Sequence, residues 1–386
     1  MGPALFPLRL PSMVLFGCGA AQKVGEEAKA LGATRVLIVC DPGIASTGMV
    51  DEIKAILEKA GLSVGVFSDI VPEPPVESLA PCVNEVRSGG YDLVVGLGGG
   101  SSMDAAKIVA ITAVHDRPIE EMFGTENVPG RGLPTIMMPT TSGTGSEATV
   151  NSILTDTKSN VKKGVVSRHL MPDVAIVDPL LTMSCPPKVS AASGMDTLTH
   201  AIESYVSVKA TAETRLFARE AITLCAQHLR TAVLNGANVA GREGMARASL
   251  YAGISISNAG TAAVHAMAYP LGAQFHTPHG VSNALLLPYV MEFNYLGDLD
   301  LFIEIAAALG EPLAGLSRRE QAEMAVKAVR QLAIDVRIPQ RLSEVGVTEA
   351  SLASMADDAI EIRRLLDNNP RSMTRDDIYG IYKLAY

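Results

Sequence analysis

The sequence lacks the features that mark nucleic-acid-binding, membrane or disulfide-built proteins. It has no dense run of Lys or Arg, and its net charge of −9 argues against a nucleic-acid backbone or an anionic membrane as the main partner. No stretch of 18 apolar residues runs without a polar, Pro or Gly interruption, and Pro3, Pro7, Arg9 and Pro11 break up the apolar N-terminus. We therefore expect a cytoplasmic protein whose partner is a small molecule.

Cysteine is scarce and scattered. The five cysteines form no CxxC pair, which favours a reducing compartment over a disulfide framework. We interpret all of them as small hydrophobic residues in the core: Cys18, Cys40, Cys82, Cys185 and Cys225.

Length and apolar content predict two folded domains. A chain of 386 residues with 48% hydrophobic and 19% charged side chains can bury two cores and is not expected to be disordered. Between residues 35 and 178, short Val/Ile/Leu-rich runs alternate with helical patterns, as in parallel sheets buried on both faces. After about residue 187 the sequence becomes rich in Ala, Leu, Glu and Arg with a 3.6-residue period, for example over 210–233 and 322–332. We predict an α/β domain with a Rossmann-like parallel sheet over 1–185, followed by an all-helical domain over 186–386; the motifs described below assign dinucleotide binding to the first and metal binding to the second.

A glycine-rich loop follows one predicted strand, at the sheet edge where open α/β folds bind ligands. This loop, GGGSSMDAAK, starts at Gly98; its glycines let a ligand approach the backbone, Ser101 or Ser102 can cap the following helix, and the exposed N–H groups suit a pyrophosphate. A tight strand-to-helix turn explains the same glycines. A Walker loop is excluded because no Gly-Lys-Ser/Thr follows, and the Gly17-Cys-Gly19 pair lacks the third glycine of GxGxxG.

A second loop, PTTSGTGSE, covers residues 139–147 and also follows a predicted strand. Its hydroxyl side chains and glycines can surround a ribose or phosphate without charge, although a simple Thr/Ser/Gly turn has the same composition. Asp41 ends another apolar strand, where a carboxylate can accept hydrogen bonds from the ribose hydroxyls and would repel a 2′-phosphate. Asp41 therefore favours NAD over NADP as the nucleotide.

Histidines cluster in the second half of the chain. Asp196 and His200 lie four residues apart on a helical pattern and so share one face, which suits adjacent coordination positions of a metal as well as a helix-surface hydrogen bond. His265 falls in an apolar helical segment, and His276 and His279 fall at a turn. These four are the majority of only seven histidines, which is hard to explain as solvated surface. Two alternatives stay open: His265 is a hydrogen-bonded histidine of the core, and His276 is only a sequence neighbour of the site.

These motifs resemble those of the iron-containing (group III) alcohol dehydrogenases, a family that also includes lactaldehyde and 1,3-propanediol reductases. The resemblance runs the length of the chain, from FGCG at 16–19 through GGGSSMDAAK, PTTSGTGSE and GMDTLTHAIESY. It continues through PHGVSNALLLP at 278–288 and the Asn369-Pro-Arg371 segment.

The resemblance implies where the metal and the nucleotide bind. The metal, usually Fe(II) and sometimes Zn(II) in this family, would be held by Asp196, His200, His265 and His279. The nucleotide would lie on Gly98, Gly99, Gly100, Ser101 and Asp104, with Thr140, Thr141 and Thr144 beside it. Asn151 and Lys162 match further positions that the family uses near the cofactor.

One position departs from the family pattern. Relatives commonly carry a second histidine four residues after the one matching His265, and this chain has Tyr269 there. The phenol either orients the substrate by a hydrogen bond or fills apolar space. Pro270 follows directly, so we expect the helix to bend or end at this point.

The predicted function is hydride transfer between a small alcohol or hydroxy acid and NAD(P), with the metal acting as a Lewis acid. One alternative is a metalloenzyme of the same fold that resembles dehydroquinate synthase or glycerol-1-phosphate dehydrogenase, although residues 190–290 hold little of the basic cluster that a phosphate needs. A non-catalytic nucleotide-binding protein is a second alternative, against which the intact metal set argues. We expect a homo-oligomer, with a dimer as the default.

Overall fold

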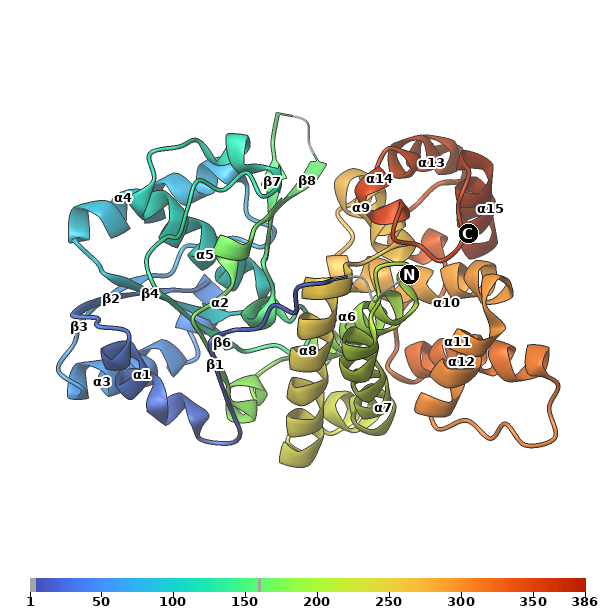
Figure 1. The fold of residues 1–386 in the computed structure, drawn as a ribbon, viewed down its shortest axis with the longest axis horizontal. Coiled ribbons are helices and arrows are strands. Elements are labelled where there is room, and N and C mark those ends of the chain that lie inside the picture. The colour runs from blue at the N-terminus through green and yellow to red at the C-terminus, as the bar shows by residue number, and fades with distance from the viewer. Residues whose placement is uncertain (1–4, 159–160) are drawn as a thin grey trace. The chain divides into compact units, whose positions relative to one another are not determined.

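The structure, a computed structural model, describes residues 5–158 and 161–386. The chain forms two compact units, one over Arg9–Cys185 and one over Pro186–Tyr386 together with residues 5–8. The first unit contains a parallel sheet with helices, and the described part of the second contains helices and no strand (Figure 1). The predicted fold class, an α/β domain followed by an all-helical domain, is confirmed.

Six parallel strands form the main sheet, in the order β1-β9-β6-β4-β2-β3. Their bounds are Met13–Phe16 (β1), Arg35–Val39 (β2), Ser63–Phe67 (β3), Leu93–Gly98 (β4), Thr135–Pro139 (β6) and Val174–Val177 (β9). The helices of this unit are Val24–Ala30 (α1), Pro42–Ala45 (α2), Met49–Lys59 (α3), Ala80–Gly89 (α4) and Gly100–Val114 (α5).

Both faces of the sheet are buried, which explains why its strands are uniformly apolar. Along β2, Val36 and Ile38 join a core with α1 and α3, whereas Leu37 and Val39 join a separate core with α4 and α5. Successive side chains of a strand point to opposite faces, so both sets must be hydrophobic.

A smaller three-stranded sheet in this unit was not predicted. It joins β5 (Gly124–Thr125), β8 (Val161–Val166) and β7 (Asn151–Asp156), with β7 and β8 antiparallel. In β7, NSILTD, buried and partly exposed residues alternate, and β8, VKKGVV, is mostly partly exposed, so both lack the continuous apolar runs on which the strand prediction depended.

The second unit is built from ten α-helices within its described residues. Their bounds are Pro187–Val206 (α6), Ala212–Leu234 (α7), Val239–Ala259 (α8), Ala263–Phe275 (α9), His279–Asn294 (α10), Leu299–Ala308 (α11), Arg318–Asp335 (α12), Leu352–Ile360 (α13), Arg363–Leu366 (α14) and Arg375–Ala385 (α15). Helix α6 packs against α7, α8 and α10, and it is buried on almost every side from Gly194 to Val206. A helix buried all round offers a polar side chain little water, so the polar residues of α6 need partners inside the unit.

The structure corrects one expectation about the surface. Cys40, Cys82 and Cys225 are buried as predicted, but Cys18 is exposed and Cys185 is only partly buried, because both lie in connecting segments outside the cores.

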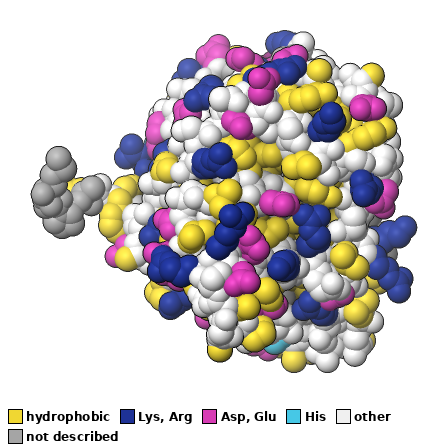
Figure 2. Space-filling view, turned by 90° about the vertical axis from the view of Figure 1, so that its right-hand side faces the viewer, with side chains coloured by type: hydrophobic (Ala, Val, Ile, Leu, Met, Phe, Trp, Pro, Cys, Tyr) yellow, Lys and Arg dark blue, Asp and Glu magenta, His cyan; other side chains and the backbone are white. Residues whose placement is uncertain are grey.

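Among the described residues no helix is long and apolar enough to cross a membrane. Figure 2 shows basic and acidic side chains interspersed on the face that it draws.

Candidate metal centre and nucleotide loops

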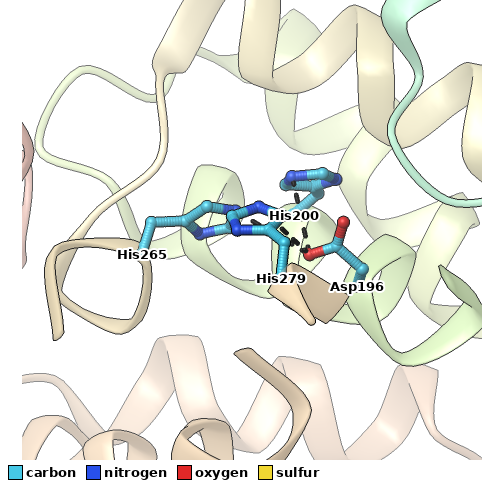
Figure 3. Close-up of side chains that lie close together, drawn as sticks. All are labelled: Asp196, His200, His265 and His279. Carbon is cyan, nitrogen blue, oxygen red and sulfur yellow. Dashed lines mark ion pairs between the residues drawn. The ribbon is translucent and has the colours of Figure 1, made fainter. Parts of the chain in front are cut away.

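Four side chains from three helices of the second unit converge on one point (Figure 3). They are Asp196 and His200 from α6, His265 from α9 and His279 from the first turn of α10. One ligand atom from each lies within 4.8 Å of all the others. The Nε2 atoms of His200 and His265 are each 3.9 Å from Asp196 Oδ1, and that of His279 is 4.0 Å from it. Three imidazoles and one carboxylate make up a donor set that suits Fe(II) or Zn(II).

The set is shielded from water except on one side. Asp196, His200 and His265 are buried, whereas the His279 side chain is 30% exposed. Burial alone would raise the pKa of Asp196, but His200, His279 and His265, together with a hydrogen bond from Asn283, outweigh it and leave this pKa below its ordinary value. The carboxylate therefore stays ionised, which is the form that binds a metal.

The close approach of α10 to α6 depends on glycine. A Cβ atom at Gly280 would lie 2.6 Å from the carbonyl oxygen of Ala192, a backbone atom that cannot move aside. The residue after His279 must therefore lack a side chain if that imidazole is to reach the residues of α6.

Glu203, which the sequence reasoning missed, fixes the orientation of His265. Its Oε2 lies 2.5 Å from His265 Nδ1, and its Oε1 accepts a hydrogen bond of 2.6 Å from the Val264 amide. Burial lowers the pKa of His265, but Glu203 and Asp196 raise it more, so the net shift is upward. With the Nδ1 proton held by Glu203, the Nε2 lone pair faces the other three ligand atoms. The only sequence signal was a carboxylate three residues after His200 in one motif.

Two further candidates lie on α9. His276 is exposed at the end of the helix, where its φ is 52°, and it does not belong to the convergent set. Tyr269 lies one turn after His265, packs partly buried against the helical core, and has its ring centroid 6.5 Å from that of His279. We expected the helix to bend or end at Pro270, and it does not end there: α9 continues to Phe275, because its packing outweighs the single hydrogen bond that a proline removes.

Most of the nucleotide-binding candidates follow the carboxyl ends of three adjacent strands, β2, β4 and β6, whereas Asn151 and Lys162 lie on β7 and β8 of the smaller sheet. The Thr140 amide donates 2.9 Å to the Gly98 carbonyl, which joins the two loops. Gly99 lies against Thr141, and a Cβ at Gly100 would lie 2.6 Å from Thr144 Cγ2. The glycines of the first loop therefore lie against the threonines of the second.

The predicted serine cap of α5 is wrong. Gly99 occupies the N-cap position, and no side chain caps this end of the helix. Ser102 Oγ instead donates 3.1 Å to Asp41 Oδ2, and Ser101 Oγ accepts 3.0 Å from the Glu73 amide. Both hydroxyls are therefore used by neighbouring segments, and the N–H groups of the first turn are left for an anion.

A buried charge network, also missed at the sequence level, ties α5 to the second loop. Lys107 Nζ donates to Ser146 Oγ at 2.8 Å, to both oxygens of Thr149 at 3.1 Å and to the Asn151 carbonyl at 2.9 Å. Burial lowers the pKa of Lys107 to about 8, although Asp104 and Glu147 oppose the shift.

The carboxyl groups of this network have different surroundings. Asp104 accepts from Ser146 Oγ at 2.5 Å and from the Ile153 amide at 2.8 Å, whereas neither carboxyl oxygen of Glu147 has a hydrogen-bond partner among the described residues. Burial raises the pKa of Glu147 to about 7. Lys162 of β8 lies outside this network and pairs at 2.5 Å with Glu73, the residue whose amide bonds to Ser101.

A metal-type donor set and an uncapped helix after a glycine-rich loop, carried by one chain, define a metal-dependent enzyme that uses a nucleotide. The model of "Iron-containing alcohol dehydrogenase" matches residues 11–179, and that of "Fe-containing alcohol dehydrogenase family, C-terminal" matches residues 190–386. The chain belongs to the iron-containing alcohol dehydrogenase family, and it is an oxidoreductase that interconverts alcohols and aldehydes. This confirms the sequence resemblance and argues against both alternative functions.

Individual relatives cover nearly the whole chain. "Long-chain-alcohol dehydrogenase 1" of Geobacillus thermodenitrificans is 43% identical over 97% of this chain and 95% of its own length. A crystal structure of 1,3-propanediol oxidoreductase is 38% identical, with a TM-score of 0.97 over 99% of this chain and 100% of that one. The structure of sulfoacetaldehyde reductase from Bifidobacterium kashiwanohense in complex with NAD+ is 31% identical, with a TM-score of 0.90 over 99% of each chain.

Proposed function

We propose that this enzyme transfers a hydride between a small alcohol and NAD, with Fe(II) held by Asp196, His200, His265 and His279. The convergence of these four side chains, with the lone pair of His265 aimed by Glu203, carries the proposal. When bound, the metal supplies a Lewis acid for the substrate oxygen and the nicotinamide takes the hydride. Zn(II) is the second choice, because the same donor set accepts it.

The residues of the chain divide the remaining work. The buried ligand set would shield a bound metal from most of the surrounding water, and electrostatic interactions are stronger in such a site. We assign the pyrophosphate to Gly98, Gly99, Gly100 and Ser101, because the first turn of α5 has no side-chain cap. We assign the remainder of the nucleotide to Asp41, Asp104, Thr140, Thr141, Thr144, Asn151 and Lys162. Nucleotide binding thus belongs to residues 1–185 and metal binding to residues 186–386.

A buried carboxyl group in the nucleotide loops also supports nucleotide binding there. Glu147, the last residue of the second loop, is a buried acceptor with no partner among the described residues. A buried carboxyl without a partner costs free energy, so a donor on a bound molecule or on water would stabilise the loaded loop.

The substrate class is small alcohols and aldehydes. Relatives named for long-chain alcohols, 1,3-propanediol and sulfoacetaldehyde share the fold, so the fold does not select one substrate, and a hydroxy acid remains an alternative. Tyr269 is the candidate for orienting the substrate, because it lies one turn from His265 with its ring near that of His279.

We also propose that the enzyme is a cytoplasmic homo-oligomer, by default a dimer. Two features support self-association: β1 is an edge strand, and Leu10, which precedes it, and Met13, its first residue, are 42% and 46% exposed. Size-exclusion chromatography with light scattering tests the oligomeric state, and a monomer at micromolar concentration would contradict it.

The choice of NAD is tested at Asp41. This carboxylate lies at the end of β2, accepts from Ser102 and caps α2 through its Oδ1, which accepts from the Ile44 amide at 3.1 Å. Asp41→Asn keeps a cap and removes the charge, so kcat/KM for NADP should rise relative to NAD. Wild-type enzyme that uses NADP more efficiently than NAD would contradict the placement of Asp41 at the ribose.

A further inference from the structure

A second group on α10 reaches the metal centre. Asn283 follows His279 by one helical turn, and its side chain is completely buried. Its Nδ2 lies 2.7 Å from Asp196 Oδ1 and 3.1 Å from the Nε2 atoms of both His265 and His279. A single amide thus lies against three of the four ligand atoms.

The chemistry of these contacts fixes which end of the amide faces the ligands. The atom 2.7 Å from Asp196 Oδ1 is Nδ2, and this orientation suits metal binding because a carboxylate that ligates a metal can only accept a hydrogen bond. A hydrogen bond to a carboxylate is also the strongest of the three, which agrees with its being the shortest. The amide oxygen of Asn283 is buried and has no hydrogen-bond partner among the described residues.

An NH2 group has two hydrogens, and here three acceptors surround it. The two imidazole Nε2 atoms each have one lone pair, which is the lone pair that a metal requires, so neither can accept from Asn283 while it ligates. A carboxylate oxygen has lone pairs to spare and can ligate a metal and accept a hydrogen bond together. The contact with Asp196 is therefore the one that is compatible with a bound metal.

We propose that Asn283 is a positioning residue of the metal centre, whose amide holds Asp196 Oδ1 in the orientation that ligates the metal. Asn283 orients the Asp196 carboxylate by a hydrogen bond, just as Glu203 orients the His265 ring. Because Asn283 and His279 share one face of α10, the same helix supplies one ligand and orients another. This role rests on the proposed metal function of the four ligand residues.

The test measures metal affinity in place of activity. Metal-free protein is titrated with Co(II) and Zn(II) against a chelating indicator, in the wild type and in Asn283→Leu, which keeps the branched shape of the side chain and removes the hydrogen bond. We expect Asn283→Leu to bind both metals about 10 to 100 times more weakly, the range typical of lost partners of metal ligands. Asn283→Ala should weaken binding similarly, and it gives the same reading if the leucine variant does not fold.

A matched control lies on the same helix. Asn294 is also a buried asparagine, but its amide pairs with that of Asn369 at 2.9 and 2.8 Å and not with the ligand set. Asn294→Leu should lower the melting temperature and leave both metal affinities unchanged. The visible spectrum of bound Co(II) should indicate the same coordination number in the wild type and in Asn283→Leu.

Two results would overturn the proposed role of Asn283 and leave the proposed metal centre intact. One is that Asn283→Leu and Asn283→Ala bind both metals as tightly as the wild type does. The other is loss of a ligand in the Co(II) spectrum of these variants, which would make Asn283 a ligand in its own right. A wild-type protein that binds neither metal would overturn the proposed metal centre itself.

Discussion

The proton on one imidazole nitrogen decides whether His265 can serve a metal. Glu203 accepts from Nδ1 with one oxygen and from the Val264 amide with the other, so both of its oxygens are committed. Glu203→Gln leaves a single acceptor for two donors, and the side chain then holds the ring less firmly. We expect metal affinity to fall about 10 to 100 times.

Metal content after dialysis against a chelator measures this effect. Glu243→Gln on α8 is a control, because the Glu243 carboxylate pairs with Arg247 at 3.0 Å and not with a proposed metal ligand. Equal metal retention in Glu203→Gln and Glu243→Gln would show that His265 needs no partner.

Tyr269 stands where the family resemblance leads us to expect a histidine. Tyr269→Phe keeps the ring that packs against the helical core and removes only the hydroxyl. If the phenol orients the substrate, kcat/KM should fall roughly tenfold with metal content unchanged. Steady-state kinetics from about pH 6 to about pH 10 would check this, and identical profiles for both proteins would assign Tyr269 to packing alone.

At the scale of elements, α5 and the second loop are held together around buried charges. Burial raises the pKa of Glu147 from 4.5 to about 7, so between these values the folded chain holds a proton that the unfolded chain has lost. The free energy of unfolding should therefore fall as pH rises from about 4.5 to about 7, by up to about 3 kcal/mol from this group. Glu147→Gln should remove that part of the slope.

Urea unfolding at several pH values across this interval measures the difference between wild type and variant. Glu52→Gln, at an exposed position of α3, is the control and should keep the wild-type slope. The same slope in Glu147→Gln as in wild type would mean that Glu147 ionises normally in the folded protein.

The elements also show which parts of the fold could be predicted. The central strands were found because burial on both faces demands an unbroken apolar run, as in β2 and β4. The β7–β8 pair was missed because neither strand is a continuous apolar run, and α9 runs past Pro270 because its buried faces stabilise it. The partners of the metal ligands were also missed: Glu203 and Asn283 reach them across α6, α9 and α10, and sequence spacing says nothing of such contacts.

For the molecule as a whole, the ligand set itself could be named in advance, for two reasons. The i, i+4 spacing of Asp196 and His200 places both on one face of α6, and four of the seven histidines fall in two short segments. His265 and His279 are assigned by their place in motifs of the iron-containing alcohol dehydrogenase family, which covers residues 11–179 and 190–386. The structure then brings all four together within 4.8 Å.

The most direct measurement removes the metal and returns it. The enzyme is stripped with a chelator, its residual metal is quantified, and NAD reduction is followed with a series of small alcohols before and after Fe(II) or Zn(II) is added. We predict that activity disappears with the metal and returns with Fe(II), less fully with Zn(II), and that His265→Ala and His279→Ala recover neither metal nor activity. Full turnover in protein that contains no metal would contradict the account.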